Sequence, residues 1–164
     1  MEVRELKPED LDELRALVQE VYSDSQLAMW FDRSPSEADL NELFRLKMLG
    51  ITSKSAVDLI AIEHGKIIGE CEIVFTGESH VMGIIVSKSK RRKGVGNELL
   101  AKGIDAARKL KFPSVFAEVA EENLPGMKFF IKNGFEQKGI SDRLFSSDGK
   151  THRIIYFKKE LYSN

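Results

Sequence analysis

The chain has 164 residues, 42% of them hydrophobic and 31% charged, and its formal net charge at pH 7 is −1. This length predicts one domain, residues 1–164, and the near-neutral charge gives no reason to expect nucleic acid or an anionic membrane as a partner. No apolar run approaches the roughly 18 residues of a membrane span, and the acidic start, Met1 to Glu5, lacks the apolar core of a signal peptide. The single cysteine excludes an internal disulfide and fits a reducing, cytoplasmic setting.

The N-terminal third predicts one strand followed by two helices. Residues 3–6 predict the strand, and Pro8 opens a helix with acidic residues in its first turn. Its apolar face is Leu11, Leu14, Leu17, Val18 and Val21. The second helix is predicted to start at Ser34, because Ser34-Pro35-Ser36-Glu37 has the pattern of a capping box with proline at the first helical position. The apolar face of that helix is Leu40, Leu43, Phe44 and Met48.

The middle of the chain predicts three strands and a helix. Residues 57–62 and 66–75 flank a hairpin turn at 63–65, and the apolar run 81–86 predicts a buried strand. A basic loop then leads into a helix, which Pro113 is expected to end. The apolar face of this helix is Leu99, Leu100, Ile104, Ala107 and Leu110.

The C-terminal part predicts a strand, a short helix and a closing hairpin. Residues 115–120 form the strand, and a helix of about ten residues fits between Pro125, a first-turn residue, and Gly134, which suits a left-handed helix end. Residues 135–140 and 153–159 are predicted to pair over a turn at 146–149. The full order, β-α-α-β-β-β-α-β-α-β-β, predicts an α+β fold with a mixed central sheet of about seven strands and four helices.

The loop before Leu99 has the chemistry of an anion site. Gly94 and Gly96 let backbone N–H groups approach a ligand because no Cβ stands in the way. The start of the following helix adds free N–H groups and the positive end of its dipole. Arg91, Arg92 and Lys93 supply positive charge and further donors. We therefore expect this loop to bind more than one phosphate group.

Other functions of glycine-rich or basic loops fit poorly. A P-loop has four residues between its glycines and then Gly-Lys-Ser/Thr, whereas here Asn97 follows two glycines that are two apart. A dinucleotide fold requires three glycines at fixed spacing. No stacking aromatic residues accompany the basic run Lys88 to Lys93, so a nucleic-acid surface is not expected. One cysteine and three scattered histidines provide no metal-binding spacing.

A second pattern lies between Ala117 and Phe135, where a strand leads to Asn123, a short helix and then Gly134-Phe135. Together with Arg91-x-x-Gly94-x-Gly96, this pattern resembles the two signatures of the GNAT (Gcn5-related) N-acetyltransferases. The resemblance covers residues 57–135 well, and the flanks agree in outline. It implies a single-domain GNAT fold, and it is nearest in pattern to the ribosomal-protein and N-terminal-peptide acetyltransferases.

The resemblance implies acetyl-CoA as cosubstrate and direct transfer of its acetyl group to a primary amine. The family's glycine loop holds the coenzyme A diphosphate, which assigns that role to Arg91, Arg92, Lys93, Gly94, Val95, Gly96 and Asn97. The backbones of Ile84, Ile85 and Val86 would bind pantetheine and the acetyl carbonyl, while their side chains lie in the core. The resemblance favours contact of Asn123 with the cofactor, while capping of the short helix alone could also explain this residue.

Glu118 is the first candidate for the base that takes the proton of the amine. It lies twelve residues before Phe130, the spacing at which the resembling branch places a catalytic glutamate. Strand alternation puts it on one face with Phe116 and Ala120, where burial would raise its pKa. A solvated or backbone-bonded strand glutamate is the structural alternative. Glu72, Glu78 and His80, or a chain of water molecules, are the other candidates for this role.

Phe130 departs from the family pattern, which commonly has a tyrosine there as general acid to the departing thiolate. Phenylalanine can pack against pantetheine but cannot donate a proton. Free thiols titrate near pH 8.5, so the thiolate can leave without it. Tyr22 and Tyr156 are candidates to replace the missing tyrosine.

The acceptor amine stays open at this level. A protein or peptide N-terminus fits Glu118, and a small amine, amino acid or polyamine is the runner-up. A catalytically silent acyl-CoA-binding or regulatory module is the alternative of a different class.

Met29-Trp30-Phe31 either caps the core or forms a wall of the acceptor pocket, and a homodimer is compatible with the resemblance. Cys71 is expected to be a small buried apolar residue.

Overall fold

The computed structural model describes residues 1–24, 35–145 and 151–162, except for the side chains of 142–145. Its strands are β1 (Glu2–Glu5), β2 (Ala56–Glu63), β3 (Lys66–Phe75), β4 (His80–Val86), β5 (Ser114–Ala120), β6 (Glu136–Phe145) and β7 (His152–Glu160). Its helices are α1 (Leu11–Asp24), α2 (Glu37–Thr52), α3 (Val95–Lys109) and α4 (Leu124–Lys132), with short 3₁₀ turns η1 (Pro8–Asp10) and η2 (Lys88–Lys90). This order confirms the predicted α+β architecture.

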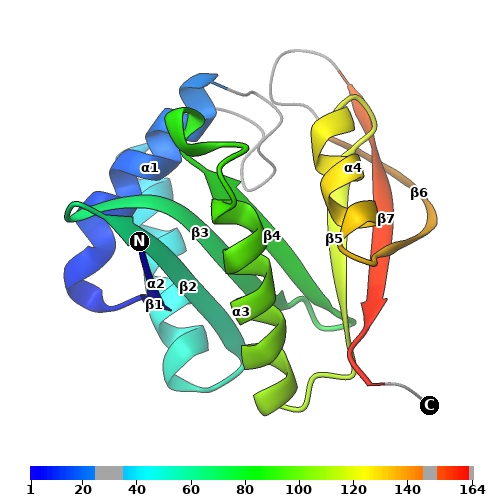
Figure 1. The fold of residues 1–164 in the computed structure, drawn as a ribbon, viewed down its shortest axis with the longest axis horizontal. Coiled ribbons are helices and arrows are strands. Elements are labelled where there is room, and N and C mark those ends of the chain that lie inside the picture. Colours follow the sequence, from blue (N-terminus) through cyan, green and yellow to red (C-terminus); the bar gives the residue numbers. More distant parts are fainter. Residues whose placement is uncertain (25–34, 146–150, 163–164) are drawn as a thin grey trace.

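The strands form one seven-stranded sheet in the order β1-β2-β3-β4-β5-β7-β6. Every neighbouring pair is antiparallel except β4 and β5, which are parallel. Helices α3 and α4 cover one face of the sheet, here called the α3/α4 face, and α1 and α2 cover the other, the α1/α2 face (Figure 1). Each face buries its own hydrophobic core, so the sheet is the middle layer of three.

Helix α3 lies very close to β3 because small residues meet at their contact. A Cβ added to Gly103 of α3 would lie 2.7 Å from the sulfur of Cys71. Cys71 is completely buried in the core of the α3/α4 face. It is therefore the small buried residue that the sequence predicts.

The second helix starts two residues later than its sequence pattern suggests. Ser36, and not Ser34, is the N-cap of α2: its Oγ accepts a hydrogen bond from the Asp39 N–H at 3.1 Å, and the Asp39 carboxylate accepts one from the Ser36 N–H at 2.8 Å. Both serines have an acidic residue three positions later, so the local pattern fits either. The prediction of a start at Ser34 is wrong, and Pro35 precedes the cap.

Two other boundaries differ from the predictions. Helix α3 ends at Lys109, before Pro113, because Lys111 adopts a left-handed conformation with φ of 61°. Strand β6 extends from the predicted 140 to Phe145, and its pairing with β7 contains two register irregularities. The predicted turn at 146–149 and the Met29-Trp30-Phe31 segment lie outside the described residues.

The parallel pair β4 and β5 separates soon after it forms. Its register contains only Val81 opposite Phe116 and Met82 opposite Ala117. Beyond these pairs both strands continue, β4 to Val86 and β5 to Ala120, without a ladder between them in the described structure. The sheet therefore opens at this point, and this opening defines the site described next.

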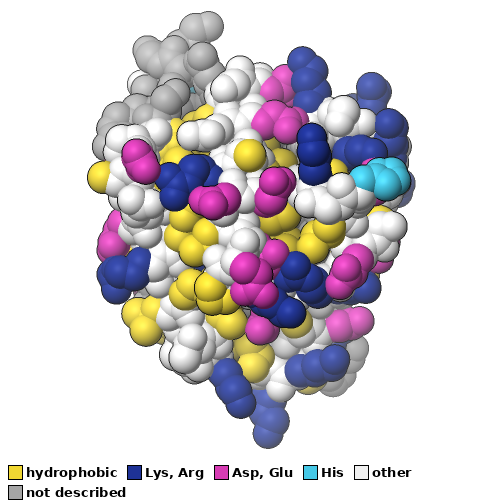
Figure 2. Space-filling model, turned by 90° about the vertical axis from the view of Figure 1, so that its left-hand side faces the viewer, with side chains coloured by type: hydrophobic (Ala, Val, Ile, Leu, Met, Phe, Trp, Pro, Cys, Tyr) yellow, Lys and Arg dark blue, Asp and Glu magenta, His cyan; other side chains and the backbone are white. Residues whose placement is uncertain are grey.

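The face shown in Figure 2 carries side chains of both charges. On the side shown in Figure 2, basic and acidic side chains lie next to one another and do not separate by sign. None of the helices in the described part of the chain has the length and apolarity needed to cross a bilayer.

Candidate active site

A cavity of about 880 Å³ opens between β4 and β5 where the two strands separate. Its volume falls within the range of small-molecule and cofactor sites, roughly 300–1,000 Å³. Its walls come from β3, β4, β5, the loop before α3, and α4. The cavity thus brings together segments that are far apart in the sequence.

Ile84, Ile85 and Val86 form the β4 wall of the cavity. On one side this strand end pairs with β3, while the described ladder to β5 stops at Met82. Main-chain groups that point toward β5 therefore face the cavity, where the amides of a ligand can bond to them. The Val86 carbonyl already accepts a hydrogen bond from Arg91 Nε at 3.0 Å.

The loop before α3 is shaped to present backbone N–H groups. Arg92 and Gly94 are both left-handed, with φ of 59° and 87°. Gly94 is the N-cap of α3, and the first helical hydrogen bond runs from the Glu98 N–H to the Gly94 carbonyl at 3.1 Å. The N–H groups at the start of the helix precede this bond and have no helical acceptor. Successive N–H groups in such a turn form an anion-binding concavity.

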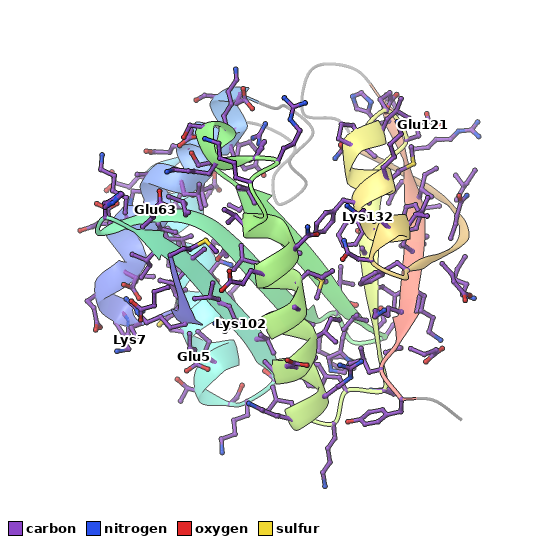
Figure 3. All side chains as sticks on the ribbon, in the orientation of Figure 1. Glu5, Lys7, Glu63, Lys102, Glu121 and Lys132 are labelled. Carbon is purple, nitrogen blue, oxygen red and sulfur yellow. The ribbon has the colours of Figure 1, made fainter. Side chains whose placement is uncertain are left out.

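Several basic side chains beside this loop are held by acidic residues from other elements. Arg91 Nη1 lies 2.6 Å from Asp24 Oδ2 at the end of α1, and Lys88 Nζ lies 2.9 Å from Asp24 Oδ1. Hydrogen bonds from Lys88 and Arg91 lower the pKa of Asp24. Lys90 pairs with Glu63, which lies at the end of β2 (Figure 3). The guanidinium of Arg91 is thereby paired within the protein, so we expect the backbone of this loop to contribute most of the donors for an anion.

Helix α4 forms the opposite wall. Asn123 caps this helix by accepting a hydrogen bond from the Gly126 N–H at 3.0 Å. Phe130 lines the cavity but is only 7% exposed. Its ring packs edge-on against Phe129 and Phe135, with centroid distances of 5.3 and 5.0 Å. Phe130 therefore belongs to both the cavity wall and the core.

Of the four side chains considered as a base, two lie at the cavity. Glu118 on β5 and Glu72 on β3 both line it. Glu78 is exposed in the turn between β3 and β4, away from the cavity walls. His80 stacks on Phe112 with a centroid distance of 3.7 Å, and burial lowers its pKa. His80 is the first residue of β4, whereas Val86, which lines the cavity, is at the far end of the strand. Its position therefore does not favour a role in the cleft.

A model of the acetyltransferase (GNAT) family matches residues 14–135. The chain belongs to the GNAT acetyltransferase family. This match and the observed architecture confirm the resemblance inferred from Arg91-x-x-Gly94-x-Gly96 and from Asn123 with Gly134-Phe135. Members of this family use acetyl-CoA, and a solved neighbour carries it.

Solved GNAT structures show how widely the fold is shared. The structure of a ribosomal-protein-alanine N-acetyltransferase from Brucella melitensis has a TM-score of 0.85 and 21% identity, with 98% of this chain and 99% of that chain covered. The yncA protein of Salmonella typhimurium, solved with acetyl-CoA, has a TM-score of 0.85 and 16% identity, with coverage of 100% and 95%. At such low identity these similarities support the fold alone.

A similar curated protein is YwnH of Bacillus subtilis, provisionally named as a phosphinothricin acetyltransferase. It is 31% identical over 80 residues, which are 49% of this chain and 49% of YwnH. The match thus spans about half the length of this relative. The substrate named for YwnH is therefore not assigned to the present GNAT chain.

The cleft of this GNAT chain gathers most of the residues predicted to hold the donor. Ile84, Ile85, Val86, Arg91, Arg92, Gly94, Gly96, Asn97, Asn123 and Phe130 all line it. Lys93 is exposed outside the cavity walls, and the side chain of Val95 is buried in the core of the α3/α4 face. The side chain of Val95 is therefore not available to a ligand. Binding of the donor by these residues stays a prediction.

Three lysines of functional interest were missed in the sequence. Lys128 and Lys132 lie four residues apart on α4 and line the cavity, and Lys132 is labelled in Figure 3. Their spacing places them on one face of the helix, which the sequence pattern could have indicated. Lys47 of α2 is buried beside Glu72. It follows Leu40 and Phe44 at helical spacing, so it too could have been noticed as a lysine on an apolar face.

Replacing Asn123 by alanine should lower the free energy of unfolding by about 1 kcal/mol, because the Gly126 N–H loses its capping acceptor. Urea denaturation of both proteins measures this loss. Asn123→Ser keeps a capping oxygen and should recover most of the stability. If both variants also bind coenzyme A more weakly than the wild type, Asn123 contacts the cofactor in addition. Equal urea midpoints for the alanine variant and the wild type would contradict the capping role.

Phe130→Tyr should leave the affinity for acetyl-CoA within about threefold of the wild type, because the two rings have similar volume and the site borders the cavity. Turnover should be equal or higher, since the new hydroxyl can serve the thiolate. Calorimetry and initial rates measure the two quantities. Phe157→Tyr is the matched control, because Phe157 is fully buried and its hydroxyl would destabilise the core. A large loss of acetyl-CoA binding in Phe130→Tyr would mean that the ring edge points into packed core.

Proposed function

We propose that this chain transfers the acetyl group of acetyl-CoA directly to a primary amine while both substrates are bound. The observation that carries this proposal is the cleft between β4 and β5, which has an anion-binding loop at one end and Glu118 on its β5 wall. The cleft crosses the sheet, so a donor can enter from the α3/α4 face and an acceptor from the α1/α2 face. Two substrates can then meet at the opening without competing for one surface.

The donor end fits coenzyme A in shape and charge. Gly94 has no atoms within 4 Å of the position that a Cβ would take, so the backbone there is accessible to phosphate oxygens. Arg92 lines the cavity and is exposed, and Lys128 and Lys132 add two cations from α4. The apolar side chains of Val86 and Phe129 suit the aliphatic pantetheine arm. Acetyl-CoA bound here supplies a thioester, which is an activated acetyl group.

The chain itself contributes orientation and proton transfer. The free main-chain groups at Ile84 to Val86 would align the donor along β4, and alignment of reacting groups is a large part of the rate gain in such transfers. Glu118 would accept the proton of the amine through its carboxylate.

Phe130 cannot return a proton to the thiolate. Tyr156 pairs with Glu118 across β5 and β7, and its hydroxyl lies 3.3 Å from Ser141 Oγ, outside the cavity walls. Tyr22 is buried in the core of the α1/α2 face.

The acceptor is proposed to be a peptide or protein N-terminus, or else a small amine. The position of Glu118 twelve residues before Phe130 favours the first class. The buried thiol of Cys71 is compatible with a cytoplasmic enzyme, since it forms no disulfide. A catalytically silent acyl-CoA-binding module is the competing function, and it would use the same donor end.

Thiol release from acetyl-CoA tests the proposal. The protein is incubated with acetyl-CoA and a panel of peptides, amino acids, amino-acid amides and polyamines, and the free thiol is measured with time. At least one amine should give saturable release above the rate without acceptor, and mass spectrometry should find the acetylated amine. Tight coenzyme A binding without amine-dependent release by any panel member would support the silent module instead.

A further inference from the structure

Four ionisable side chains are buried together on the α1/α2 face beside the cleft. Lys47 of α2 lies with its Nζ 3.0 Å from Asp58 Oδ2 and 2.8 Å from Glu70 Oε1, and it also pairs with Glu72. Their side chains are between 1% and 8% exposed. Burying charges is costly, and such a cluster is weak evidence for stability by itself.

The balance of charge within this cluster makes Lys47 essential to it. Although burial alone would lower the pKa of Lys47, the three carboxylates outweigh it and raise that pKa well above the ordinary value. Burial raises the pKa of Asp58 and of Glu70. Three carboxyl groups thus share one ammonium ion, and Lys47 is the cation that holds the Glu72 side chain in this cluster.

Glu72 is the member of the cluster that lines the cavity. In the β3–β4 register it lies directly opposite Gly83. A Cβ added to Gly83 would find no atom within 4 Å, so there is open space beside Glu72. Gly83 is also the first β4 residue after the last pair with β5, Met82 opposite Ala117. The gap in the sheet therefore begins next to the Glu72 carboxylate.

Glu118 lies on the other side of the same gap. It is the β5 residue that follows Ala117, and Ala117 pairs with Met82 just before Gly83. Ala117 belongs to the core of the α3/α4 face, so Glu118 points to the α1/α2 face, as Glu72 does. Two carboxylates, one from β3 and one from β5, thus flank the glycine gap on the face where an acceptor would enter.

We propose that Glu72 binds the cationic amine of the acceptor at this gap and that Lys47 is the residue that positions Glu72. The carboxylates of Glu72 and Glu118 together exclude acceptors that carry a carboxylate beside the amine. This inference rests on the proposed function. The acceptor class is then peptide N-termini, amino-acid amides or polyamines, and not free amino acids. Glu72 forms no covalent bond to either substrate and takes no proton during the transfer. The proton of the amine goes to Glu118.

The groups that face Glu72 come from each element packed around it. They are Lys47 from α2, Asp58 from β2, Glu70 from β3 and Glu118 from β5, and Tyr22 of α1 is buried in the core of the same face. Lys47 is the cation among these groups. Without it, the three buried carboxyl groups lie together with no ammonium ion to hold the Glu72 carboxyl in place. Loss of Lys47 should therefore weaken acceptor binding.

The test compares matched acceptors on matched variants. Initial rates are measured with phenylalanine amide and with free phenylalanine for the wild type, Glu72→Gln, Lys47→Met, Lys47→Arg and Glu78→Gln, and calorimetry measures acetyl-CoA binding by each. Glu78→Gln is the control, because it removes the same charge from an exposed turn. The wild type should prefer the amide by at least about tenfold in kcat/KM, which corresponds to 1.4 kcal/mol.

Glu72→Gln should raise KM for the amide about tenfold while kcat changes less than about threefold, and its preference for the amide should fall. Lys47→Met should also raise KM for the amide, because Glu72 loses the ion pair that positions it, and Lys47→Arg, which keeps the cation, should restore the wild-type KM. Unchanged acetyl-CoA affinity shows that each variant is folded. If Lys47→Met does not fold, the KM of Glu72→Gln alone tests whether Glu72 binds the acceptor amine.

Two results would overturn the inference while leaving the proposed function intact. One is a wild type that acetylates phenylalanine as well as its amide, and the other is a Glu72→Gln variant with unchanged KM. A wild type that binds acetyl-CoA but acetylates no amine would overturn both the function and the inference. These outcomes are distinguishable in one set of assays.

Discussion

The Gly96→Asp variant should lose about a thousandfold in affinity for acetyl-CoA while it keeps its fold. Gly96 lies in the first turn of α3 and lines the cavity. A Cβ there would lie 3.4 Å from the Phe129 ring, which is a contact that small movements can accommodate. The added carboxylate would stand where the loop is shaped for phosphate. Two like charges about 4 Å apart near a protein surface repel by roughly 4 kcal/mol, which is about three factors of ten in affinity.

Calorimetric titration with coenzyme A measures this loss, and circular dichroism verifies the fold. Gly139→Asp is the matched control: it adds the same charge at a glycine of β6 with open space around it, away from the cavity. The control should bind coenzyme A as the wild type does. If Gly96→Asp binds coenzyme A as tightly as the wild type, the assignment of the diphosphate to this loop is wrong.

Replacing Glu118 by glutamine should lower turnover by roughly 10²–10⁴-fold, the contribution typical of a general base. Glutamine keeps the shape and the hydrogen-bonding end of the side chain but cannot accept the proton of the amine. The affinity for acetyl-CoA should stay within a few-fold, because the donor end of the cleft is unchanged. Initial rates with an acceptor from the panel, together with calorimetry, measure both quantities.

Glu121→Gln is the control for this experiment. Glu121 lies just beyond β5, outside the cavity walls, and is labelled in Figure 3. Its replacement removes the same charge three residues away and should leave turnover within a few-fold. Wild-type turnover by Glu118→Gln between pH 6 and 9 would mean that Glu118 is structural. Glu72, the other candidate that lines the cleft, would then be tested as the base.

The order of elements could be predicted because it depends on local patterns. The apolar spacing of α1 and α3 and the alternation of the strands are properties of short windows of sequence. The start of α2 could not be fixed in the same way. Ser34 with Glu37 and Ser36 with Asp39 offer the same pattern of a cap followed by an acidic residue. The structure has the cap at Ser36, and the two sequence patterns alone do not distinguish it from Ser34.

Some features of the candidate site could likewise be predicted from local sequence, and others depend on the fold. The glycine loop and the Asn123 helix carry dense local signatures, and the structure places both at one cleft. The pairing of Arg91 with Asp24 could not be predicted, because the two residues lie 67 positions apart and meet only through the fold. The alternation of Glu70 and Glu72 indicates that they share a strand face. That Lys47 would lie against them depends on how α2 crosses the sheet.

A crystal structure of the complex with coenzyme A tests the central claim most directly. We predict the diphosphate within hydrogen-bond distance of the backbone N–H groups between Arg92 and Asn97, with pantetheine along Ile84 to Val86 and the sulfur at the gap near Gly83. Coenzyme A bound elsewhere, for example in the groove that Arg15 and Phe44 line between α1 and α2, would contradict the account.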